Sequence, residues 1–585
     1  MAPSGVPVAP TALELVVGWV TLSLIAGLTY LSPGLRRGSE LMPWPDGLEY
    51  AASAVNLAAG RGAVLHFGGY TYPSRYTGGY PLILEFFYRF GGVHAPLFLS
   101  STLLAVLSVF FVLYLTRFLI GNAASLIAAV LLGLSPIFIT YSSLVMSDVP
   151  TLFVTLIAAL ALVAATTDEP PKSSGRMLIG ASLMLGLFAG FSTIIRPTNG
   201  AILVGLAVCI VMVPLENRAL SRLIKAGIAV AVGFAIPVAW QLHQNSINLG
   251  SAFASGYAWW VPEVYGAGGK TFSAAYLFGP TMPRNPHGNV IVYVTTLLGL
   301  DGMLGDRGNP RYFLYPFAAA VFAIVGFIAT LRAPDRTAAR RLMWFGLGYL
   351  VALTGLYCFY LFTDVAFILP AAFILFIAAG AGAALANRWL RDVLRERGRS
   401  AAQFAAATAV ILLDVLLVIS LASEVAVRLT PGPWHSQMVE SLESLEPKLP
   451  GDAIIVSNIS LQFLDLYLGE DLHYVGLNSL DPGERFTDYH LHRLYEKRAA
   501  GWSGPVPAVV FDGEQMSSAA AGSLASAIDA KRPVFLILAA PESQQYADVL
   551  KTELEELRGK FSVEPVAQSE AIAVYRVTAH VTARR

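Results

Sequence analysis

Up to residue 431, the chain alternates between long apolar segments and short polar connections. An α-helix needs roughly 20 mostly apolar residues to cross the hydrocarbon core of a bilayer. About eleven segments come close to this length, at 13–31, 96–116, 123–141, 149–166, 178–195, 198–215, 223–243, 312–331, 342–362, 365–387 and 403–423. The pattern predicts a polytopic α-helical membrane protein with about 11 transmembrane helices.

Residues 432–585 have a different pattern, in which short apolar runs alternate with helical stretches. Strand-like runs occur at "AIIVSN" (453–458), "AVVFDG" (508–513) and "VFLILAA" (534–540), with helical patterns at 519–530 and 543–557. This alternation predicts a C-terminal soluble α/β domain with a partly parallel sheet. His490 and His492 are interpreted as part of a solvated helix face, because two histidines without a third ligand are a weak metal signal.

Composition agrees with a membrane protein. Of the 585 residues, 55% are hydrophobic and only 13% are charged, whereas soluble domains carry about 25% charged residues. The formal net charge is +0, which argues against nucleic acid as a partner. Cys209 and Cys358 lie inside apolar runs and indicate neither a disulfide framework nor a reactive thiol.

Basic residues indicate the orientation of the chain. Lysine and arginine gather in alternate short connections, while the intervening short turns carry only Arg196. Because basic connections stay on the cytoplasmic side, we expect an integral, multi-pass protein of the plasma (inner) membrane with a cytoplasmic N-terminus. The chain then divides into a membrane domain, two outer loops within it and an extracytoplasmic domain, at 1–431, 32–95 with 246–311, and 432–585.

Two acidic residues, Asp46 and Glu49 in "MPWPDGLEYAA", follow the first apolar segment on the outer side. Asp-x-x-Glu after a proline is typical of a capping box, here at the start of a helix 46–59 that would lie on the membrane surface. A capping carboxylate stays exposed at one edge, so the spacing favours a structural and a functional Asp46 equally. Asp148 has the same two interpretations, as the cap of a helix that begins near Pro150.

The same outer boundary carries Arg75, Arg196, Arg311 and Asp364. Ionisable groups at such boundaries are costly and usually hold a ligand or each other. Snorkelling explains Arg196 adequately, but an anion site at the head-group level explains it better.

The loop 246–311 contains the aromatic stretch "SGYAWWVPEVYGAGGKTF". Tyr257, Trp259 and Trp260 suit a membrane-interface belt, and they would equally suit a gate over a lipid chain or a sugar face. Arg284 and His287, in "MPRNPHGN", are explained either as loop structure or as ligand contacts.

Four stretches in the membrane part together resemble a known family: "PDGLEYAASAVNLAAGRG", "GGYPLILEFFYRFGG", "SPIFITYSSLVMSDVPTLF" and "GFSTIIRPTNG". In this order and topology they resemble the GT-C superfamily of polyprenyl-phosphate-sugar-dependent glycosyltransferases. The nearest branch is the bacterial one related to protein O-mannosyltransferases and lipid A aminoarabinose transferases, of the glycosyltransferase family 39 or 83 type. The resemblance covers roughly residues 10–390, as a pattern of order rather than of identity.

The resemblance implies an inverting transfer from a polyprenyl-phosphate-linked sugar donor to a lipid, glycan or protein acceptor at the outer membrane face. It implies that Asp46 is the general base, Glu49 an orienting neighbour and Asp148 a supporting acid. The donor phosphate would bind basic residues, for which the candidates are Arg75, Arg196, Arg284 and Arg311. Contacts to substrate or lipid would come from Tyr50, Tyr76, Tyr80, Tyr257, Trp259, Trp260 and His287.

The chain departs from the family pattern at two basic positions. Gly78 and Gly79 stand where the family often has a lysine or histidine, and Ala366 stands where many members have an arginine. The phosphate site would therefore be rebuilt from the four arginines named above. The first outer loop has no Asp-x-Asp, so no cofactor is expected to be required; a divalent metal is possible but unsupported.

Two other functions stay open from the sequence. A transporter or flippase for a lipid-linked saccharide would also need many helices and an outer basic pocket, although no inverted repeat or matching pair of broken helices is visible. A non-catalytic envelope assembly protein, with the C-terminal domain as its binding module, would be favoured if Asp46 proved dispensable.

Overall fold

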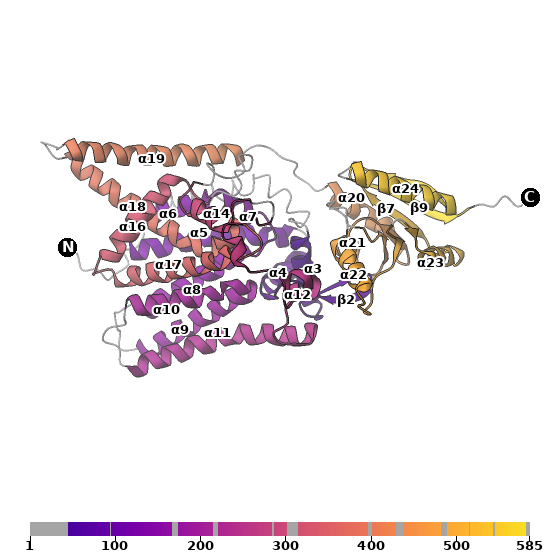
Figure 1. Ribbon diagram of the computed structural model, residues 1–585, viewed down its shortest axis with the longest axis horizontal. Helices are drawn as coiled ribbons and strands as arrows, with labels where there is room; N and C mark the ends of the chain where they lie inside the picture. Colours follow the sequence, from indigo (N-terminus) through magenta and orange to yellow (C-terminus); the bar gives the residue numbers. More distant parts are fainter. Residues whose placement is uncertain are drawn as a thin grey trace, which may run out of the picture.

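The structure, a computed structural model, describes residues 45–580 except 94, 167–173, 214–219, 283–285, 301–313, 396–400, 429–436, 481–487, 514 and 542–543. It has two parts, a helical bundle and a C-terminal sheet domain, which follow each other along the long axis of the molecule (Figure 1). The coarse fold class, a multi-span helical membrane protein with a C-terminal α/β domain, is confirmed.

Six helices of the described chain are long and apolar enough to cross a membrane. They are α5 (Ala95–Leu119), α8 (Asp148–Thr166), α9 (Ser174–Ile195), α11 (Leu220–Leu249), α17 (Thr337–Cys358) and α18 (Leu369–Arg395). A seventh span is formed if α6 (Asn122–Gly133) and α7 (Pro136–Ser142) count as one, with a bend of 62° between them. The bend lies at Ser135, which is extended because it precedes Pro136.

The described residues thus contain six or seven spans, fewer than the predicted eleven. Three predicted segments correspond to shorter apolar helices: α10 (Ile202–Met212) with the turn η2 (Pro197–Ala201), α16 (Phe317–Arg332), and the apolar part of α19 (Ala401–Arg428). The segment 13–31 lies outside the described residues. For α10 and α16 the difference arises because apolar sequence continues through turns, whereas a span requires an uninterrupted helix. Helix α19 is a single helix of 28 residues.

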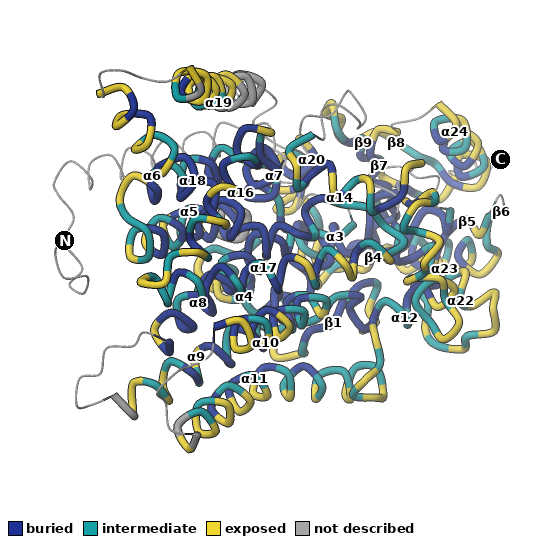
Figure 2. The backbone as a smooth tube through the Cα atoms, turned by 60° about the vertical axis from the view of Figure 1, so that its left-hand side comes forward, coloured by how far each residue is buried: buried dark blue, intermediate teal, exposed yellow. Residues whose placement is uncertain are grey.

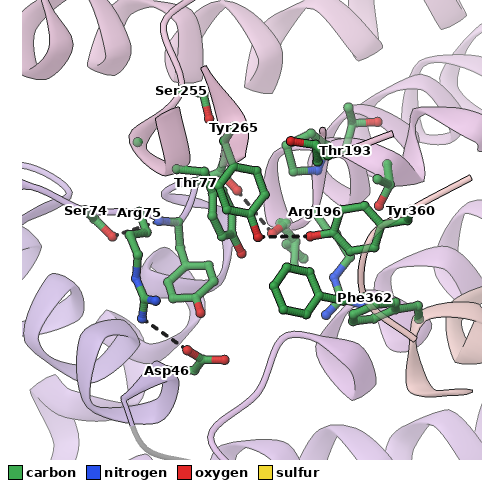
Figure 3. A pocket seen from close by; sticks show the side chains of 18 of the residues that line it. Asp46, Ser74, Arg75, Thr77, Thr193, Arg196, Ser255, Tyr265, Tyr360 and Phe362 are labelled. Atoms are coloured by element: carbon green, nitrogen blue, oxygen red, sulfur yellow. Dashed lines mark hydrogen bonds and ion pairs between the residues drawn. The ribbon is translucent and has the colours of Figure 1, made fainter. Parts of the chain in front are cut away.

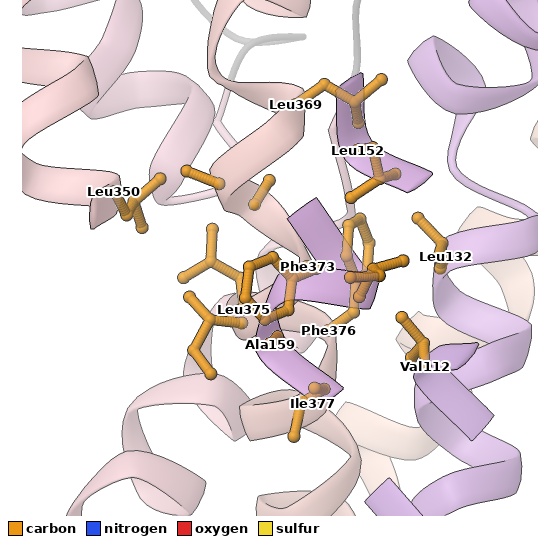
Figure 4. Packing of buried hydrophobic residues seen from close by; sticks show 14 of the residues in the cluster. Val112, Leu132, Leu152, Ala159, Leu350, Leu369, Phe373, Leu375, Phe376 and Ile377 are labelled. Atoms are coloured by element: carbon orange, nitrogen blue, oxygen red, sulfur yellow. The ribbon is translucent and has the colours of Figure 1, made fainter. Parts of the chain in front are cut away.

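Burial separates the centre of the bundle from its rim. In α18, 94% of the apolar span is buried, and in α11 only 17%, so α18 is the central helix and α11 an outer wall (Figure 2). Phe373, Phe376 and Ile377 of α18 pack among side chains of the surrounding helices (Figure 4). Glycine allows the closest approach: a Cβ added to Gly382 would lie 1.9 Å from the carbonyl oxygen of Phe322 in α16.

Short elements form the end of the bundle that faces the sheet domain (Figure 1). They are α3 (Asp46–Ala58), β1 (Val64–Phe67), β2 (Tyr70–Pro73), α4 (Gly79–Gly91), α12 (Gly256–Trp260), α13 (Pro262–Tyr265), α14 (Asn289–Leu297) and η5 (Val365–Ile368). The helix predicted at 46–59 exists, but the prediction that it lies on the membrane surface is wrong. Leu48 and Ala51 are fully buried, because α3 packs against α4 and β1.

The C-terminal domain contains a seven-stranded sheet in the order β6-β5-β4-β3-β7-β9-β8. Its strands are β3 (Ile454–Ser457), β4 (His473–Asn478), β5 (Val509–Asp512), β6 (Gln515–Met516), β7 (Val534–Ala539), β8 (Phe561–Gln568) and β9 (Ile572–Ala579). The four central strands are parallel and the edge strands antiparallel, as the alternating pattern predicted. Its helices are α20 (Gln437–Leu445), α21 (Leu461–Leu468), α22 (Tyr489–Ala499), α23 (Ser518–Asp529) and α24 (Gln544–Lys560).

The sheet domain is docked on the short elements at the end of the bundle through a shared apolar core. One buried cluster contains Leu48 of α3 and Phe67 of β1 together with Leu461 of α21 and Leu491 of α22. In Figure 1, α21 and α22 lie on the side of the domain that faces α3 and α12. Because fully burying each large apolar side chain contributes about 1.5–3 kcal/mol, this core holds the two parts together.

Candidate active site

A cavity of about 1900 Å³ lies among the short outer elements. Its walls come from α3, the connection between β2 and α4, η2, α11, the α12–α13 segment and η5. Asp46, Arg75 and Arg196 line it. Asp46 and Arg75 lie on one side, and Arg196, Tyr360 and Phe362 on the other (Figure 3). The cavity therefore brings together groups from three segments that are far apart in the sequence.

On the first side, Arg75 bridges two acids of α3. Its Nη2 donates to Oδ1 of Asp46 at 3.1 Å, and its Nε donates to Oε2 of Glu49 at 2.6 Å. Oε1 of Glu49 accepts from Oγ of Ser74 at 3.0 Å and from the backbone N–H of Arg75. These contacts leave Asp46 at the cavity wall and place Glu49 behind it.

Glu49 is fully buried and does not line the cavity. Burial alone would raise the pKa of its carboxyl, but the charge of Arg75 and the hydrogen bond from His490 lower that pKa to about 2. An acid held ionised in this way cannot exchange protons with a substrate near neutral pH. Glu49 can act on Asp46 only through Arg75.

On the second side, Nη1 of Arg196 donates to Oδ1 of Asp148 at 2.6 Å. Asp148 begins α8 and is fully buried, and Arg196 precedes η2. The guanidinium lies 5.1 Å from the ring of Phe367. Oδ2 of Asp148 has no hydrogen-bond partner in the described part of the chain.

In the first ion pair the acid is the more exposed partner, and in the second ion pair the arginine is. In the first pair the side chain of Asp46 is 32% exposed and that of Arg75 is 9% exposed. In the second pair Arg196 is 14% exposed and Asp148 is 0% exposed. One side of the cavity therefore presents a carboxylate, and the other presents a guanidinium.

Tyrosine and phenylalanine rings line much of the space between the two pairs. Tyr50 and Tyr76 stack with their ring centroids 4.2 Å apart, and Tyr76 meets Tyr257 edge to face at 5.4 Å. The cavity lining also includes His287, Tyr265, Tyr357, Tyr360 and Phe367. Such rings suit contact with sugar faces or apolar chains.

Comparison with known proteins agrees with this architecture. Residues 79–240 match the family model described as dolichyl-phosphate-mannose-protein mannosyltransferase. The fold is similar to that of ArnT from Cupriavidus metallidurans bound to undecaprenyl phosphate, with a TM-score of 0.59, 13% identity, and coverage of 97% of this chain and 98% of ArnT. The resemblance to the GT-C glycosyltransferases is confirmed.

A second solved structure gives a weaker match. The Archaeoglobus fulgidus oligosaccharyltransferase tethered with an acceptor peptide is similar with a TM-score of 0.51 and 11% identity, over 95% of this chain and 74% of that protein. No curated protein sequence is significantly similar to the chain. The family model covers α4 to α11, so it includes Asp148 and Arg196 of the candidate site and begins after Asp46 and Arg75.

The structure corrects the capping-box interpretation of α3. The N-cap of α3 is Pro45, no side chain caps the helix, and Asp46 is its first residue. Instead of reaching back to the helix start, the Glu49 carboxylate binds Arg75 and His490. Charged partners brought in by the tertiary fold displace the local hydrogen bonds, because ionic hydrogen bonds are about twice as strong as neutral ones.

Three predicted contact residues do not line the cavity. Tyr80 is buried and bonds to Ser101, Trp260 is buried and donates to the carbonyl of Pro73, and Trp259 packs against Lys497. Trp260 and Trp259 thus belong to the contact with the sheet domain rather than to a membrane-interface belt. Arg284 and Arg311 lie outside the described residues.

The interpretation of His490 as part of a solvated helix face was wrong. Its side chain is fully buried, not solvated, and its Nε2 lies 3.0 Å from Oε2 of Glu49. The two residues are 441 positions apart, so no local pattern could indicate the pair. Among the described residues, no group of three or more His, Cys, Asp or Glu is arranged to hold a metal ion.

Proposed function

We propose that this chain is an inverting membrane glycosyltransferase that moves a sugar from a polyprenyl-phosphate-linked donor to an acceptor hydroxyl. The observation that carries the proposal is the opposite exposure of the two ion pairs, Asp46 outward from Arg75 and Arg196 outward from Asp148. Displacement at an anomeric carbon needs a base on one side and an anion-stabilising group on the other. The family match over 79–240 supports the same reaction class.

In the proposed reaction, the carboxylate of Asp46 accepts the proton of the acceptor hydroxyl as the oxygen attacks the anomeric carbon. The new C–O bond forms while the bond between that carbon and the phosphate oxygen breaks, and the bonding electrons leave with the polyprenyl phosphate. Arg196 faces the negative charge that develops on this leaving group, and the carboxylate of Asp46 faces the oxocarbenium-like carbon. The configuration inverts because attack and departure occur on opposite faces.

The donor and the membrane side are part of the proposal. ArnT, which shares the fold over nearly its whole length, was crystallised with undecaprenyl phosphate, so a polyprenyl phosphate is the expected carrier. The cavity is large enough for a sugar phosphate together with an acceptor, at about 1900 Å³ against roughly 300–1,000 Å³ for small-ligand pockets. The distribution of basic residues supports a position at the outer face, where the proposed acceptor is a cell-envelope glycolipid, polysaccharide or protein.

The test compares the wild type with Asp46→Asn in nanodiscs. Both proteins are incubated with radiolabelled polyprenyl-phosphate sugars and envelope extract, and donor binding is measured separately. We expect the wild type to transfer label and the Asn variant to bind donor while losing transfer by roughly 10²- to 10⁴-fold. Asp512→Asn is the matched control, because Asp512 pairs with Arg498 on the surface of the sheet domain at 3.7 Å.

Two results would contradict the proposal. Equal transfer by the wild type and the Asp46→Asn variant would show that Asp46 is not the base. Binding of donor by the wild type without transfer to any acceptor in the extract would favour the transporter or the assembly function instead.

A further inference from the structure

Helix α22 is the element of the sheet domain that reaches the back of the candidate active site. His490, in its first turn, is fully buried, with Nε2 3.0 Å from Oε2 of Glu49. The His490 ring also meets the ring of Trp260 edge to face at 4.8 Å. Since Glu49 is ionised, its oxygen accepts and Nε2 of His490 donates the hydrogen bond.

The contacts of Glu49 leave it no freedom to turn. One of its oxygens accepts from Ser74 and from the backbone of Arg75, and the other accepts from Nε of Arg75 and from His490. A buried carboxylate is stable only if such donors surround it. Removing the donor from His490 therefore frees one side of the Glu49 carboxylate and loosens its hold on Arg75.

Arg75 transmits this constraint to Asp46. Its guanidinium lies between two rings, 5.2 Å from the centroid of Tyr76 and 4.9 Å from that of Tyr489, the residue before His490. Its Nη2 then holds Oδ1 of Asp46 at 3.1 Å. Two consecutive residues of α22 thus fix the arginine that orients the carboxylate in the cavity.

The same helix also holds the wall of the cavity next to Arg75, the α12–α13 segment. Arg493 donates to Glu263 of α13 at 3.1 Å, and Nζ of Lys497 lies 4.2 Å from the ring of Trp259 in α12. The α12–α13 segment carries Tyr257 and Tyr265, which line the cavity. Helix α22 therefore supports the Arg75 side of the cavity and the α12–α13 segment that packs beside it.

We propose that His490 is a positioning residue and that α22 of the sheet domain is a structural part of the active centre. His490 fixes Glu49, Glu49 fixes Arg75, and Arg75 sets the direction of the Asp46 carboxylate. The C-terminal domain is then required for the chemical step itself. This inference rests on the proposed function, in which Asp46 is the base.

The test uses three substitutions in the full-length protein in nanodiscs. His490→Gln keeps an N–H donor near the position of Nε2, whereas His490→Asn keeps the amide but places it near the position of Nδ1, too short to reach Glu49. His492→Gln is the matched control, because this neighbouring histidine of α22 is 29% exposed and does not contact Glu49. Each variant is assayed for kcat, KM and donor binding.

We expect His490→Asn to lower kcat by about 10- to 100-fold with donor binding unchanged, as misplacement of a reacting group by about 1 Å does. His490→Gln should recover most of the rate, and His492→Gln should equal the wild type. Wild-type kcat in the Asn variant, or equal losses in the Asn and Gln variants, would overturn the proposal. A parallel fall in donor binding by a folded Asn variant would also overturn it, because the effect would then not be confined to the chemical step.

Backbone hydrogen exchange gives a readout that does not depend on activity. Residues 70–80 should exchange faster in His490→Asn than in the wild type, while His490→Gln and His492→Gln should leave them unchanged. Unchanged exchange in the Asn variant would overturn the proposal even if no donor proved active. If His490→Asn does not fold, Tyr489→Leu, which removes the ring that lies over Arg75 and Arg493, is expected to lower kcat in its place, and wild-type kcat in that variant would overturn the proposal.

Discussion

The two ion pairs of the cavity contain the same groups, but different parts of the molecule hold them. Arg75 and Asp46 lie where the outer elements meet the sheet domain, and Glu49 and His490 complete their surroundings. Arg196 and Asp148 lie at the ends of bundle helices, without a contribution from the sheet domain among the described residues. The comparison shows that the first pair depends on the sheet domain, whereas the second pair is held by the helical bundle.

Arg75→Gln tests the first pair and should have the largest effect. It removes the cationic partner of the buried Glu49, which should destabilise the protein by roughly 3–5 kcal/mol, and it frees Asp46. We expect transfer to fall with little change in donor binding. Thermal unfolding and single-turnover transfer in nanodiscs measure the two losses.

The double variant Glu49→Gln/Arg75→Gln separates these two losses. Because both buried charges are then absent, most of the stability should return while transfer stays low. Recovery of transfer together with stability would show that Arg75 has no part in orienting Asp46.

Arg196→Gln tests the second pair and should change a different property. It removes the exposed guanidinium, so we expect donor affinity to fall by about 10- to 100-fold, as loss of a hydrogen bond to a charged group does. Stability should also fall, because Asp148 stays buried without its partner. Equilibrium binding of radiolabelled donor measures the effect.

Asp148→Asn/Arg196→Gln is the corresponding double variant. It should recover stability but not donor affinity. If donor affinity is unchanged in Arg196→Gln while transfer is lost, the proposed division of roles between the two pairs is wrong.

Because Glu49 is ionised beside Arg75, the free energy of unfolding should decrease at acid pH. Its pKa is lowered from 4.5 to about 2 in the folded protein, so its ionised form stabilises the fold at any pH above about 4.5. This contribution, roughly 3 kcal/mol from the size of the shift, is lost as the pH falls from 4.5 through about 2. Unfolding temperatures between pH 6 and pH 3 should therefore fall more steeply for the wild type than for Glu49→Gln.

Glu470→Gln serves as the control for this pH series. Glu470 pairs with Arg61 at the rim, where the side chains are 41% and 33% exposed, and such surface pairs contribute less than about 1 kcal/mol. Equal slopes for the wild type and Glu49→Gln would contradict the proposed burial of an ionised Glu49.

Glu553 in the sheet domain has a raised pKa, whereas that of Glu49 is lowered. We expect its effect on stability to be the smallest of those considered. Burial raises its pKa to about 7, and the hydrogen bond from the Asn478 amide offsets only part of that rise. Its protonated form is therefore favoured by folding, and stability should fall by roughly 1–3 kcal/mol as the pH rises from 4.5 through 7. Between pH 5 and pH 8, the free energy of unfolding of Glu553→Gln should lose this decrease with pH. If the variant shows the same pH dependence as the wild type, the raised pKa of Glu553 is contradicted.

The sequence by itself determined the fold class and many elements. Long apolar segments require a membrane, so α5, α8, α9, α11, α17 and α18 follow from hydropathy and length. Short β-branched runs fixed the strands β3, β5 and β7, because apolar strands must be covered on both faces. Asp46, Arg75 and Arg196 could be named as candidates since charged groups at a membrane boundary are costly and rarely lack a role.

Tertiary structure alone decided how these groups are paired and which of them face the cavity. Local spacing favoured a capping box for Asp46 and Glu49, but Arg75 and His490 displace it. Without a third metal ligand nearby, His490 was interpreted as part of a solvated helix face, yet docking of the sheet domain buries it. Partners separated by hundreds of residues leave no periodic signal, because their energy of interaction depends on distance in space and on burial rather than on spacing along the chain.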